Sequence, residues 1–191
     1  MAEILRHPIC LRRLQQELDH LNNVSSKLDR QDLVNQSHLD ELPYLKAVVN
    51  ETLRLHIPLP TLIPHKSTQA CQVGGYNIPK DTCLFVNVSA IARDPSIWGN
   101  PHEFKPERFL NKNNPIDVHV KNFEFLPFGV GRRGCPGYHL ASSIIELLLS
   151  NMVYKFDWRL PNGKDIDMSE KCVNAVARKE PLMVIPILRH H

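Results

Sequence analysis

The ten residues around Cys135 place the strongest constraint on the fold, because the segment Phe128–Gly137 reads Phe-Gly-Val-Gly-Arg-Arg-Gly-Cys-Pro-Gly. Its glycines remove side chains from around the sulfur, so a flat ligand and backbone N–H groups can approach it closely. The apolar residues that follow at helical spacing predict a helix with Pro136 in its first turn. Two adjacent arginines and a helix start both favour a thiolate over a thiol. This cysteine loop (Phe128–Gly137) therefore predicts an anionic sulfur that is open to a ligand.

Three other kinds of site compete for the cysteine loop. A phosphate-binding loop would need the ending Gly-Lys-Ser/Thr and a preceding strand, and the sequence supplies neither. A zinc site would need further ligands in register with the cysteine, and none are. A thiol enzyme that works without a cofactor would need a histidine base, and no histidine is tied to Cys135 by spacing. The thiol enzyme stays open as an alternative to a ligand-binding thiolate.

Composition narrows the class of protein further. With 191 residues, 42% of them hydrophobic and 23% charged, the chain can bury a core as one domain or as part of a larger one. The net charge of +3 is too small and too dispersed to indicate nucleic-acid binding. The five cysteines form no Cys-x-x-Cys pair, which favours a reducing compartment. No apolar run of about 18 residues and no signal peptide is present, so the chain as written predicts no membrane anchor or targeting signal.

Helices are predicted towards both ends of the chain. Proline positions and apolar spacing predict helices over residues 1–6, from Pro8 to Asn22, and from Pro43 to the prolines that follow residue 57. The polar mixture of residues 24–39 predicts a surface connection between the second helix and the third. After the cysteine loop, apolar residues cover more than one helical face, so the last helix is predicted to be largely buried.

The middle of the chain predicts turns and short strands, because the prolines gather there. Residues 72–79 predict a tight hairpin at a Gly-Gly pair, followed by a strand over 82–88 and a short helix over 89–93. Residues 97–126 predict a long ordered meander that is held by packed aromatic residues, namely Trp98, Phe104, Phe109, Phe123 and Phe125. A second small sheet is predicted near the C-terminus. The expected fold class is mainly α with small β-sheets, that is, α+β.

One charged pair lies within the predicted third helix. Glu51 and Arg54 are three residues apart on one helical face, which is typical of a solvated ion pair worth about 0.2–0.5 kcal/mol. The flanking residues are apolar, however, and a second arginine follows in the segment Pro106–Phe109. These residues could complete a buried network of three charged side chains, so both interpretations stay open.

Three motifs together resemble the cytochrome P-450 superfamily. The residues Phe128, Gly131, Arg133, Cys135 and Gly137 match its heme-binding signature Phe-x-x-Gly-x-Arg-x-Cys-x-Gly. The segments Glu51–Arg54 and Pro106–Phe109 match its Glu-x-x-Arg helix and its Pro-Glu-Arg-Phe segment, in the right order. The amino-acid sequence of the cysteine loop most resembles that of plant microsomal members of the superfamily. The resemblance implies that residues 1–191 form a single partial domain, the C-terminal heme-binding part of an incomplete P-450 fold, with the distal half and the membrane anchor absent.

The resemblance also implies roles for individual residues. Cys135 would be the axial ligand of heme iron, and the other heme-binding residues would be Arg133, Phe128, Gly137 and His65, with Arg133 and His65 at the propionates. Glu51, Arg54 and Arg108 would form a structural triad that holds the meander on its helix. Beyond the iron ligand, no catalytic residue is expected within this chain. The substrate pocket would be lined by residues of two segments, namely Leu59, Thr61, Leu62 and Asn174.

The implied function is that of a heme-thiolate monooxygenase. It would take electrons from NADPH through a flavoprotein reductase and insert one oxygen atom of O2 into a small organic substrate, such as a plant secondary metabolite. Arg132 and Lys121 would present positive charge to the acidic reductase. The full-length parent is expected at the endoplasmic reticulum membrane on its cytosolic face, and this chain alone in the cytoplasm. The alternatives are a truncated, non-catalytic P-450 fragment and the heme-free thiol enzyme.

Overall fold

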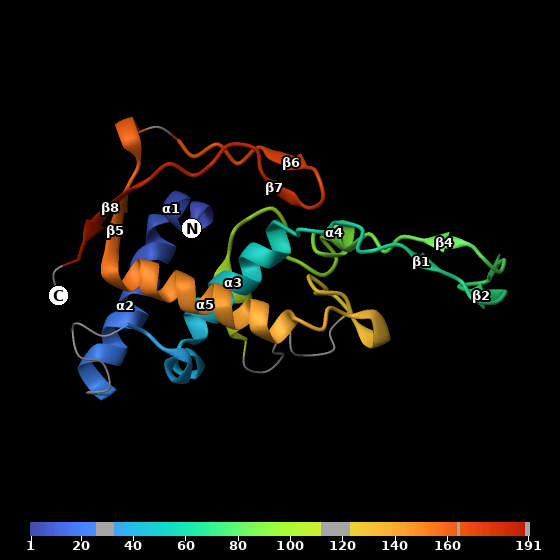
Figure 1. The fold of residues 1–191 in the computed structure, drawn as a ribbon, viewed down its shortest axis with the longest axis horizontal. Helices are drawn as coiled ribbons and strands as arrows, with labels where there is room; N and C mark the ends of the chain where they lie inside the picture. The colour runs from blue at the N-terminus through green and yellow to red at the C-terminus, as the bar shows by residue number, and fades with distance from the viewer. Residues whose placement is uncertain (26–32, 112–122, 164, 190–191) are drawn as a thin grey trace.

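The computed structural model describes residues 1–25, 33–111, 123–163 and 165–189. Figure 1 shows helices packed into a body, and strands β1–β4 extending from one end of that body as an arm. The helices are α1 (Ala2–Arg6), α2 (Pro8–Ser25), η1 (Gln36–Glu41), α3 (Pro43–Leu55), α4 (Val88–Ile91), η2 (Pro106–Leu110), η3 (Gly131–Arg133), α5 (Tyr138–Lys155) and η4 (Pro161–Gly163). The strands are β1 (His65–Lys66), β2 (Cys71–Val73), β3 (Tyr76–Ile78), β4 (Cys83–Leu84), β5 (Phe156–Arg159), β6 (Glu170–Cys172), β7 (Val176–Arg178) and β8 (Ile185–Leu188).

The first three predicted helices are confirmed, and they build the core with α5. The chain leaves α1 at His7, because the residue before a proline is pushed out of the helical region, and Pro8 then opens α2. Apolar residues of α2 and α3 are fully buried in one cluster, among them Leu14, Leu18 and Leu45. Helix α2 runs to Ser25, beyond its predicted end at Asn22, since asparagine only weakens a helix and no proline or glycine stops it there.

Helix α5 differs from its prediction in two ways. It begins at Tyr138 with Gly137 as the N-cap, so Pro136 precedes the helix instead of lying in its first turn. The predicted burial on more than one face is wrong, because the described residues cover one side of α5, which packs on α2, α3 and η1. The inner side buries residues such as Val153. Several large apolar residues of α5 are exposed, with Leu140 67%, Ile144 47%, Ile145 38% and Leu148 60% accessible.

The segment predicted as a surface connection is partly buried. Of residues 24–39, positions 26–32 lie outside the described residues, while Val34, His38 and Leu39 are buried. The side chain of Asn151 in α5 allows the Val34 backbone to be buried, because it pairs with both backbone groups of that residue. The Val34 N–H donates to its Oδ1 at 2.9 Å, and its Nδ2 donates to the Val34 carbonyl at 2.8 Å.

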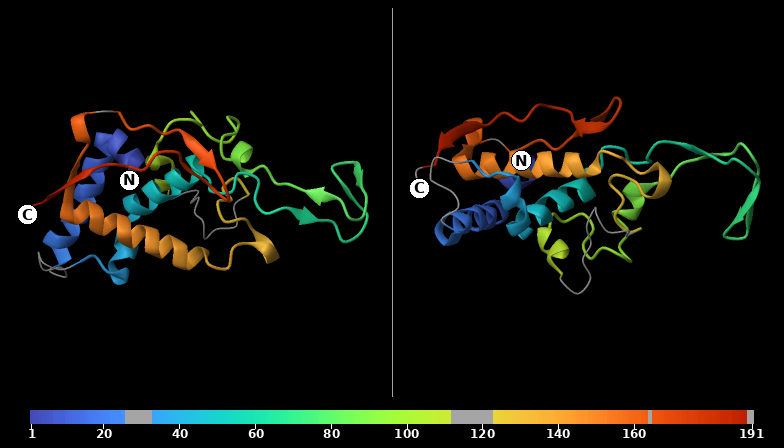
Figure 2. Two further views of the ribbon diagram at one scale, coloured as in Figure 1. Left: turned by 45° about the horizontal axis from the view of Figure 1, so that its top comes forward. Right: turned by 60° about the horizontal axis from the view of Figure 1, so that its bottom comes forward.

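The arm follows the predicted hairpin. Strands β2 and β3 pair across Gly74 and Gly75, whose positive φ angles of 55° and 86° suit a tight two-residue turn. The predicted strand over residues 82–88 is shorter than expected. Only β4 forms, paired with β1, and Val88 instead opens α4, where the Asn87 side chain accepts a hydrogen bond from the Ala90 N–H. Both views in Figure 2 show the arm projecting away from the helices.

The predicted aromatic packing beneath the meander is largely confirmed. Trp98, Phe104 and Phe125 are buried, and the Phe109 ring lies 5.1 Å from that of Phe125. Phe123 is the exception, since it is 70% exposed. It is the first described residue after positions 112–122, which lie outside the described residues.

Two antiparallel pairs close the chain, as predicted for a small C-terminal sheet. β5 pairs with β8, and the β6–β7 hairpin (Glu170–Arg178) returns over the end of α3. The Val176 N–H donates to the Pro58 carbonyl at 2.8 Å, which fixes the hairpin to the chain that leaves α3. None of the described helices is long and apolar enough to span a membrane.

Candidate functional site

The cysteine loop is held by its own backbone. The Cys135 N–H donates to the Phe128 carbonyl at 2.9 Å, and the Gly134 N–H donates to the Gly131 carbonyl at 3.1 Å. These bonds close the loop around η3, and the chain then reaches Gly137, the N-cap of α5. The Cys135 side chain is exposed at this point. The local geometry therefore fixes the backbone and leaves the sulfur accessible.

Two glycines of the loop have conformations that other residues avoid. Gly129 and Gly131 have φ angles of 71° and 76°, where a side chain would strain the backbone. A β-carbon built on Gly131 would meet no atom within 4 Å, so backbone strain alone requires glycine there. A β-carbon on Gly137 would lie 4.0 Å from the Cys135 sulfur. The loop thus keeps the space beside the sulfur free of side chains.

Arg132 and Arg133 occupy η3, and both side chains are exposed. The Phe128 ring is half-buried and lies 6.4 Å from the Tyr138 ring at the start of α5. Cysteine sulfur, guanidinium and aromatic groups therefore occur together on one short stretch of chain. Lys121, which was predicted to add positive charge near this loop, lies outside the described residues.

Glu51, Arg54 and Arg108, here called the charge network, lie together in the core. The Arg54 guanidinium donates from Nε and Nη2 to the two Glu51 oxygens at 2.7 and 2.9 Å, a two-point pairing. Arg108 Nε donates to Glu51 Oε1 at 3.0 Å. The side chains of Glu51 and Arg54 are fully buried, and that of Arg108 is 11% exposed. The solvated-pair interpretation is therefore wrong for this pair.

The charge network is bonded to the meander through backbone groups. Arg54 donates to the carbonyls of Ala92, Pro101 and Glu103 at 2.7, 2.7 and 3.2 Å. The Lys105 N–H donates to Glu51 Oε1 at 2.8 Å. The Trp98 ring lies under the guanidinium of Arg54, whose carbon is 5.1 Å from the ring centre. These bonds satisfy the buried charges and fix the path of residues 92–105 on α3.

The predicted substrate-pocket residues lie on two connected segments. Leu59 and Thr61 are exposed on the turn after α3, and Leu62 is half-buried with a positive φ of 52°. A β-carbon on Gly129 would lie 3.7 Å from Leu62 Cδ1, which places that turn against the cysteine loop. Asn174 is exposed in the turn of the β6–β7 hairpin. The structure therefore joins Leu62 to the loop directly, and Asn174 only through the Val176–Pro58 bond.

His65, the predicted second propionate partner, begins the arm. It is exposed in β1, where it pairs with Leu84 of β4. Only two residues separate it from Leu62, so the turn that contacts the cysteine loop also directs the start of the arm.

Two polar residues were missed by the sequence reasoning. Arg93 donates to the Leu55 carbonyl at the end of α3 and to the Ser89 hydroxyl, so it ties α4 to α3. His56 is the residue directly after α3, and its ring nitrogens lie 2.7 Å from a Glu3 oxygen and 2.9 Å from a Glu170 oxygen. A histidine at a helix end carries no periodic signal, and its partners lie 53 and 114 residues away in sequence.

Comparison with known proteins decides the family. The Cytochrome P450 family model matches residues 1–186. The chain belongs to the cytochrome P450 family. Cytochrome P450 76C4 of Arabidopsis thaliana is 45% identical over 190 residues, covering 98% of this chain and 36% of that protein. A 3-beta-hydroxylase of Tanacetum parthenium is 46% identical over 192 residues, covering 99% of this chain and 37% of that protein.

Two further comparisons agree with this family. A strychnine-11-hydroxylase of Strychnos nux-vomica is 43% identical over 188 residues, covering 97% of this chain and 35% of that protein. A solved structure of a zebrafish cytochrome P450 with abiraterone matches with a TM-score of 0.84 and 32% identity, covering 100% of this chain and 42% of that one. The predicted resemblance and its α+β cytochrome P450 fold are confirmed. The chain spans little more than a third of the length of these curated relatives.

Proposed function

We propose that this cytochrome P450 chain binds heme through the Cys135 thiolate and forms the proximal part of a monooxygenase. The observation that carries the proposal is the exposed Cys135 sulfur, held by backbone hydrogen bonds in a loop with glycines at strained positions, within a family of heme-thiolate proteins. A heme with a thiolate ligand supplies the activation of O2 from which one oxygen atom enters an organic substrate.

The residues of the loop fit a heme as ligand. The open space at Gly131 and the missing side chain at Gly137, beside the sulfur, suit the close approach of a flat macrocycle. The exposed sulfur of Cys135 is a soft donor for iron. Arg133 would pair with a propionate through its guanidinium, and His65 would reach the second. Phe128 would lie beside the macrocycle and Gly137 would keep the sulfur side of the loop clear.

The charge network of Glu51, Arg54 and Arg108 would stabilise the fold and would take no part in the reaction. By bonding residues 92–105 to α3, they would keep the meander in place while the loop binds its ligand. The exposed Arg132 would offer positive charge to an acidic flavoprotein reductase that passes electrons from NADPH, and Lys121 would add to it.

The substrate would be a small organic molecule of plant secondary metabolism. Two relatives are described as a 3-beta-hydroxylase and a strychnine-11-hydroxylase, both names that denote insertion of oxygen at a carbon. Leu59, Thr61 and Leu62 would form one wall of its pocket, next to the cysteine loop, and Asn174 would approach from the β6–β7 hairpin. The full-length parent would act at the cytosolic face of the endoplasmic reticulum membrane.

The experiment is a carbon monoxide spectrum of the chain loaded with hemin and reduced. Ligation by a thiolate shifts the Soret band strongly to the red, so the band is expected in the unaltered chain and in Cys83→Ser, whose cysteine is also exposed. Cys135→Ser should lose the band while still binding some hemin. Absence of the band from all three proteins would overturn the proposal and would leave the two alternatives, a non-catalytic fragment and a heme-free thiol enzyme.

A further inference from the structure

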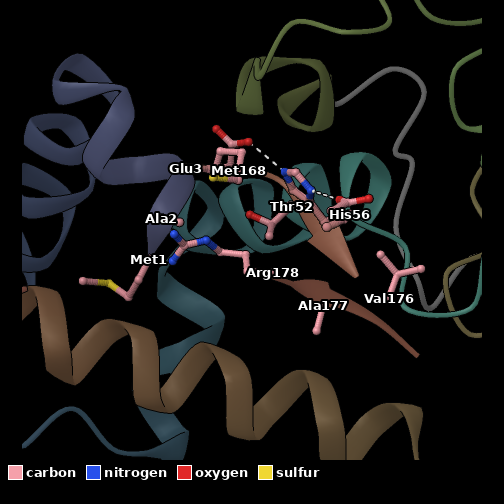
Figure 3. A pocket seen from close by; sticks show the side chains of 10 residues that line it. Met1, Ala2, Glu3, Thr52, His56, Met168, Val176, Ala177 and Arg178 are labelled. Atoms are coloured by element: carbon pink, nitrogen blue, oxygen red, sulfur yellow. Dashed lines mark hydrogen bonds and ion pairs between the residues drawn. The ribbon is translucent and has the colours of Figure 1, made fainter. Parts of the chain in front are cut away.

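His56 joins three elements that are distant in sequence. It follows the last residue of α3, and its ring contacts Glu3 of α1, as Figure 3 shows, and also Glu170 of β6. Both ring nitrogens meet carboxylate oxygens, at 2.7 and 2.9 Å. An ionised carboxylate only accepts hydrogen bonds, so this arrangement requires both ring nitrogens to donate. The geometry therefore describes a charged imidazolium shared by two carboxylates.

The two carboxylates differ in how firmly they are held. The Glu3 side chain is 6% exposed and is also contacted by Arg6 Nη1 and His7 Nδ1, each at 3.4 Å. The Glu170 side chain is 39% exposed, so water can replace His56 as its partner at little cost. If the imidazolium loses a proton, one nitrogen becomes an acceptor facing a carboxylate, and that contact must open. The contact to Glu170 is the one that would open.

Glu170 begins the β6–β7 hairpin, and this hairpin has a second attachment close by. The Val176 N–H of β7 donates to the Pro58 carbonyl, two residues after His56. One strand is thus tied to His56 by a side chain, and the other to Pro58 by the backbone. The turn between them carries Asn174, while the segment after Pro58 contacts the cysteine loop through Leu62.

We propose that His56 is a positioning residue, whose ion pair with Glu170 holds the β6–β7 hairpin against the segment after α3 and so sets one wall of the substrate pocket. This inference rests on the proposed function, because a pocket wall acts on a substrate only where heme is bound. It adds to that function a residue whose ring hydrogen-bonds to Glu3 and Glu170, outside the cysteine loop. Protonated His56 keeps the hairpin docked, and neutral His56 releases it.

The charges around His56 fix the direction of its pH dependence. Its hydrogen bond to Glu3, followed by that to Glu170, raises the pKa of His56 against the opposing effect of burial. Burial raises the pKa of Glu3, but its hydrogen bond to His56 and the charges of His56, Arg6 and His7 outweigh burial and leave that pKa lowered. Arg178 of β7 and Met1 line the same cavity of about 150 Å³, where Arg178 adds positive charge and burial lowers the pKa of the Met1 amino group.

These shifts give the window of the effect. Because the pKa of His56 is raised in the folded chain, charged His56 stabilises the docked hairpin fully at pH values below about 6.5, the ordinary pKa of histidine. This contribution is lost as the pH rises through the pKa of folded His56. The ionised Glu3 carboxylate, whose pKa is lowered, contributes stability that is lost only as the pH falls through the pKa of folded Glu3. The hairpin should therefore stay docked below about pH 6.5 and loosen as the pH rises through the raised pKa of His56.

Hydrogen exchange of the intact chain tests the docking. The protection factor of the Val176 amide, corrected for the intrinsic effect of pH, should fall by up to about fivefold as the pH rises through the pKa of His56. Glu170→Ala should show the low protection at every pH, and Glu170→Gln should lose the pH dependence. Glu180→Ala, an exposed carboxylate just beyond β7, is the matched control and should behave like the unaltered chain. Equal protection in the unaltered chain and Glu170→Ala would overturn the proposal.

Two azoles test the effect on the pocket in the hemin-loaded chain. Imidazole binding depends on coordination at the iron alone, whereas 4-phenylimidazole also contacts the walls of the pocket. The ratio of their dissociation constants therefore measures the contribution of the pocket walls to binding. Glu170→Ala should change this ratio several-fold and leave the carbon monoxide band in place. An unchanged ratio would overturn the positioning role. Loss of the band in every variant, with the exchange result intact, would instead overturn the heme site and leave the docking by His56 standing.

Discussion

The charge network and the cysteine loop both depend on arginine, and they are built in opposite ways. In the network, Glu51 and Arg54 are fully buried, and Arg54 is bonded to one carboxylate and three backbone carbonyls. In the loop, Arg132, Arg133 and Cys135 are all exposed, and backbone hydrogen bonds fix the chain. A buried charge without its partner is costly, so the network must be complete in the folded chain. The loop keeps its charged groups available for a ligand.

The largest expected effect comes from breaking the network. Arg54→Ala leaves the Glu51 carboxylate buried with one fewer partner and frees three carbonyls, so the free energy of unfolding should fall by about 3–5 kcal/mol. Urea denaturation followed by circular dichroism measures this change. Arg13→Ala is the matched control, because its ion pair with Glu107 joins side chains that are 48% and 38% exposed, and it should cost at most about 1 kcal/mol. Equal losses in both variants would contradict a special role for burial.

A smaller effect is expected from the backbone of the loop. Gly131→Ala forces a β-carbon onto a residue with a φ of 76° and should cost about 1–2 kcal/mol, although the added atom meets no neighbour. Gly99→Ala separates strain from the mere addition of a methyl group, because that glycine also has open space around it but no positive φ. The same denaturation experiment should show Gly99→Ala close to the unaltered chain. A Gly131→Ala variant that unfolds like Gly99→Ala would show that the loop is not strained.

The smallest effect on stability should come from the proposed iron ligand itself. Cys135→Ser changes one exposed atom, so the heme-free chain should keep its free energy of unfolding within about 0.5 kcal/mol. Thermal unfolding of the heme-free proteins checks this. A large loss of stability would mean that the sulfur packs as a structural group, and the contrast between the network and the loop would then fail.

Sequence reasoning was most successful where chemistry depends on local spacing. The Gly74–Gly75 turn, the helix breaks at Pro8 and Pro43, and the loop before α5 all follow from backbone preferences that a few residues determine. The Glu51–Arg54 pair could be found by its spacing. Its environment could not, because the carbonyls that complete it come from residues 92–103, whose path is set by tertiary packing.

Burial was the property that sequence predicted least well. Helix α5 is apolar on more than one face, yet the described residues cover only one of them, and Leu140 and Leu148 stay exposed. Val34 lies in a polar stretch and is buried all the same, because Asn151 supplies partners for its backbone. The bridging role of His56 depends on two glutamates from opposite ends of the chain. No short-range pattern records such partners.

Iron K-edge X-ray absorption of the hemin-loaded chain tests the central claim most directly, because it identifies the atoms bound to the metal without reference to activity. If Cys135 is the axial ligand, a sulfur atom contributes to the first coordination shell of the unaltered chain and of Cys83→Ser. That contribution is expected to vanish in Cys135→Ser, whose heme-free fold should be intact. A first shell of nitrogen and oxygen alone in the unaltered chain, or a sulfur signal that survives Cys135→Ser, would contradict the assignment.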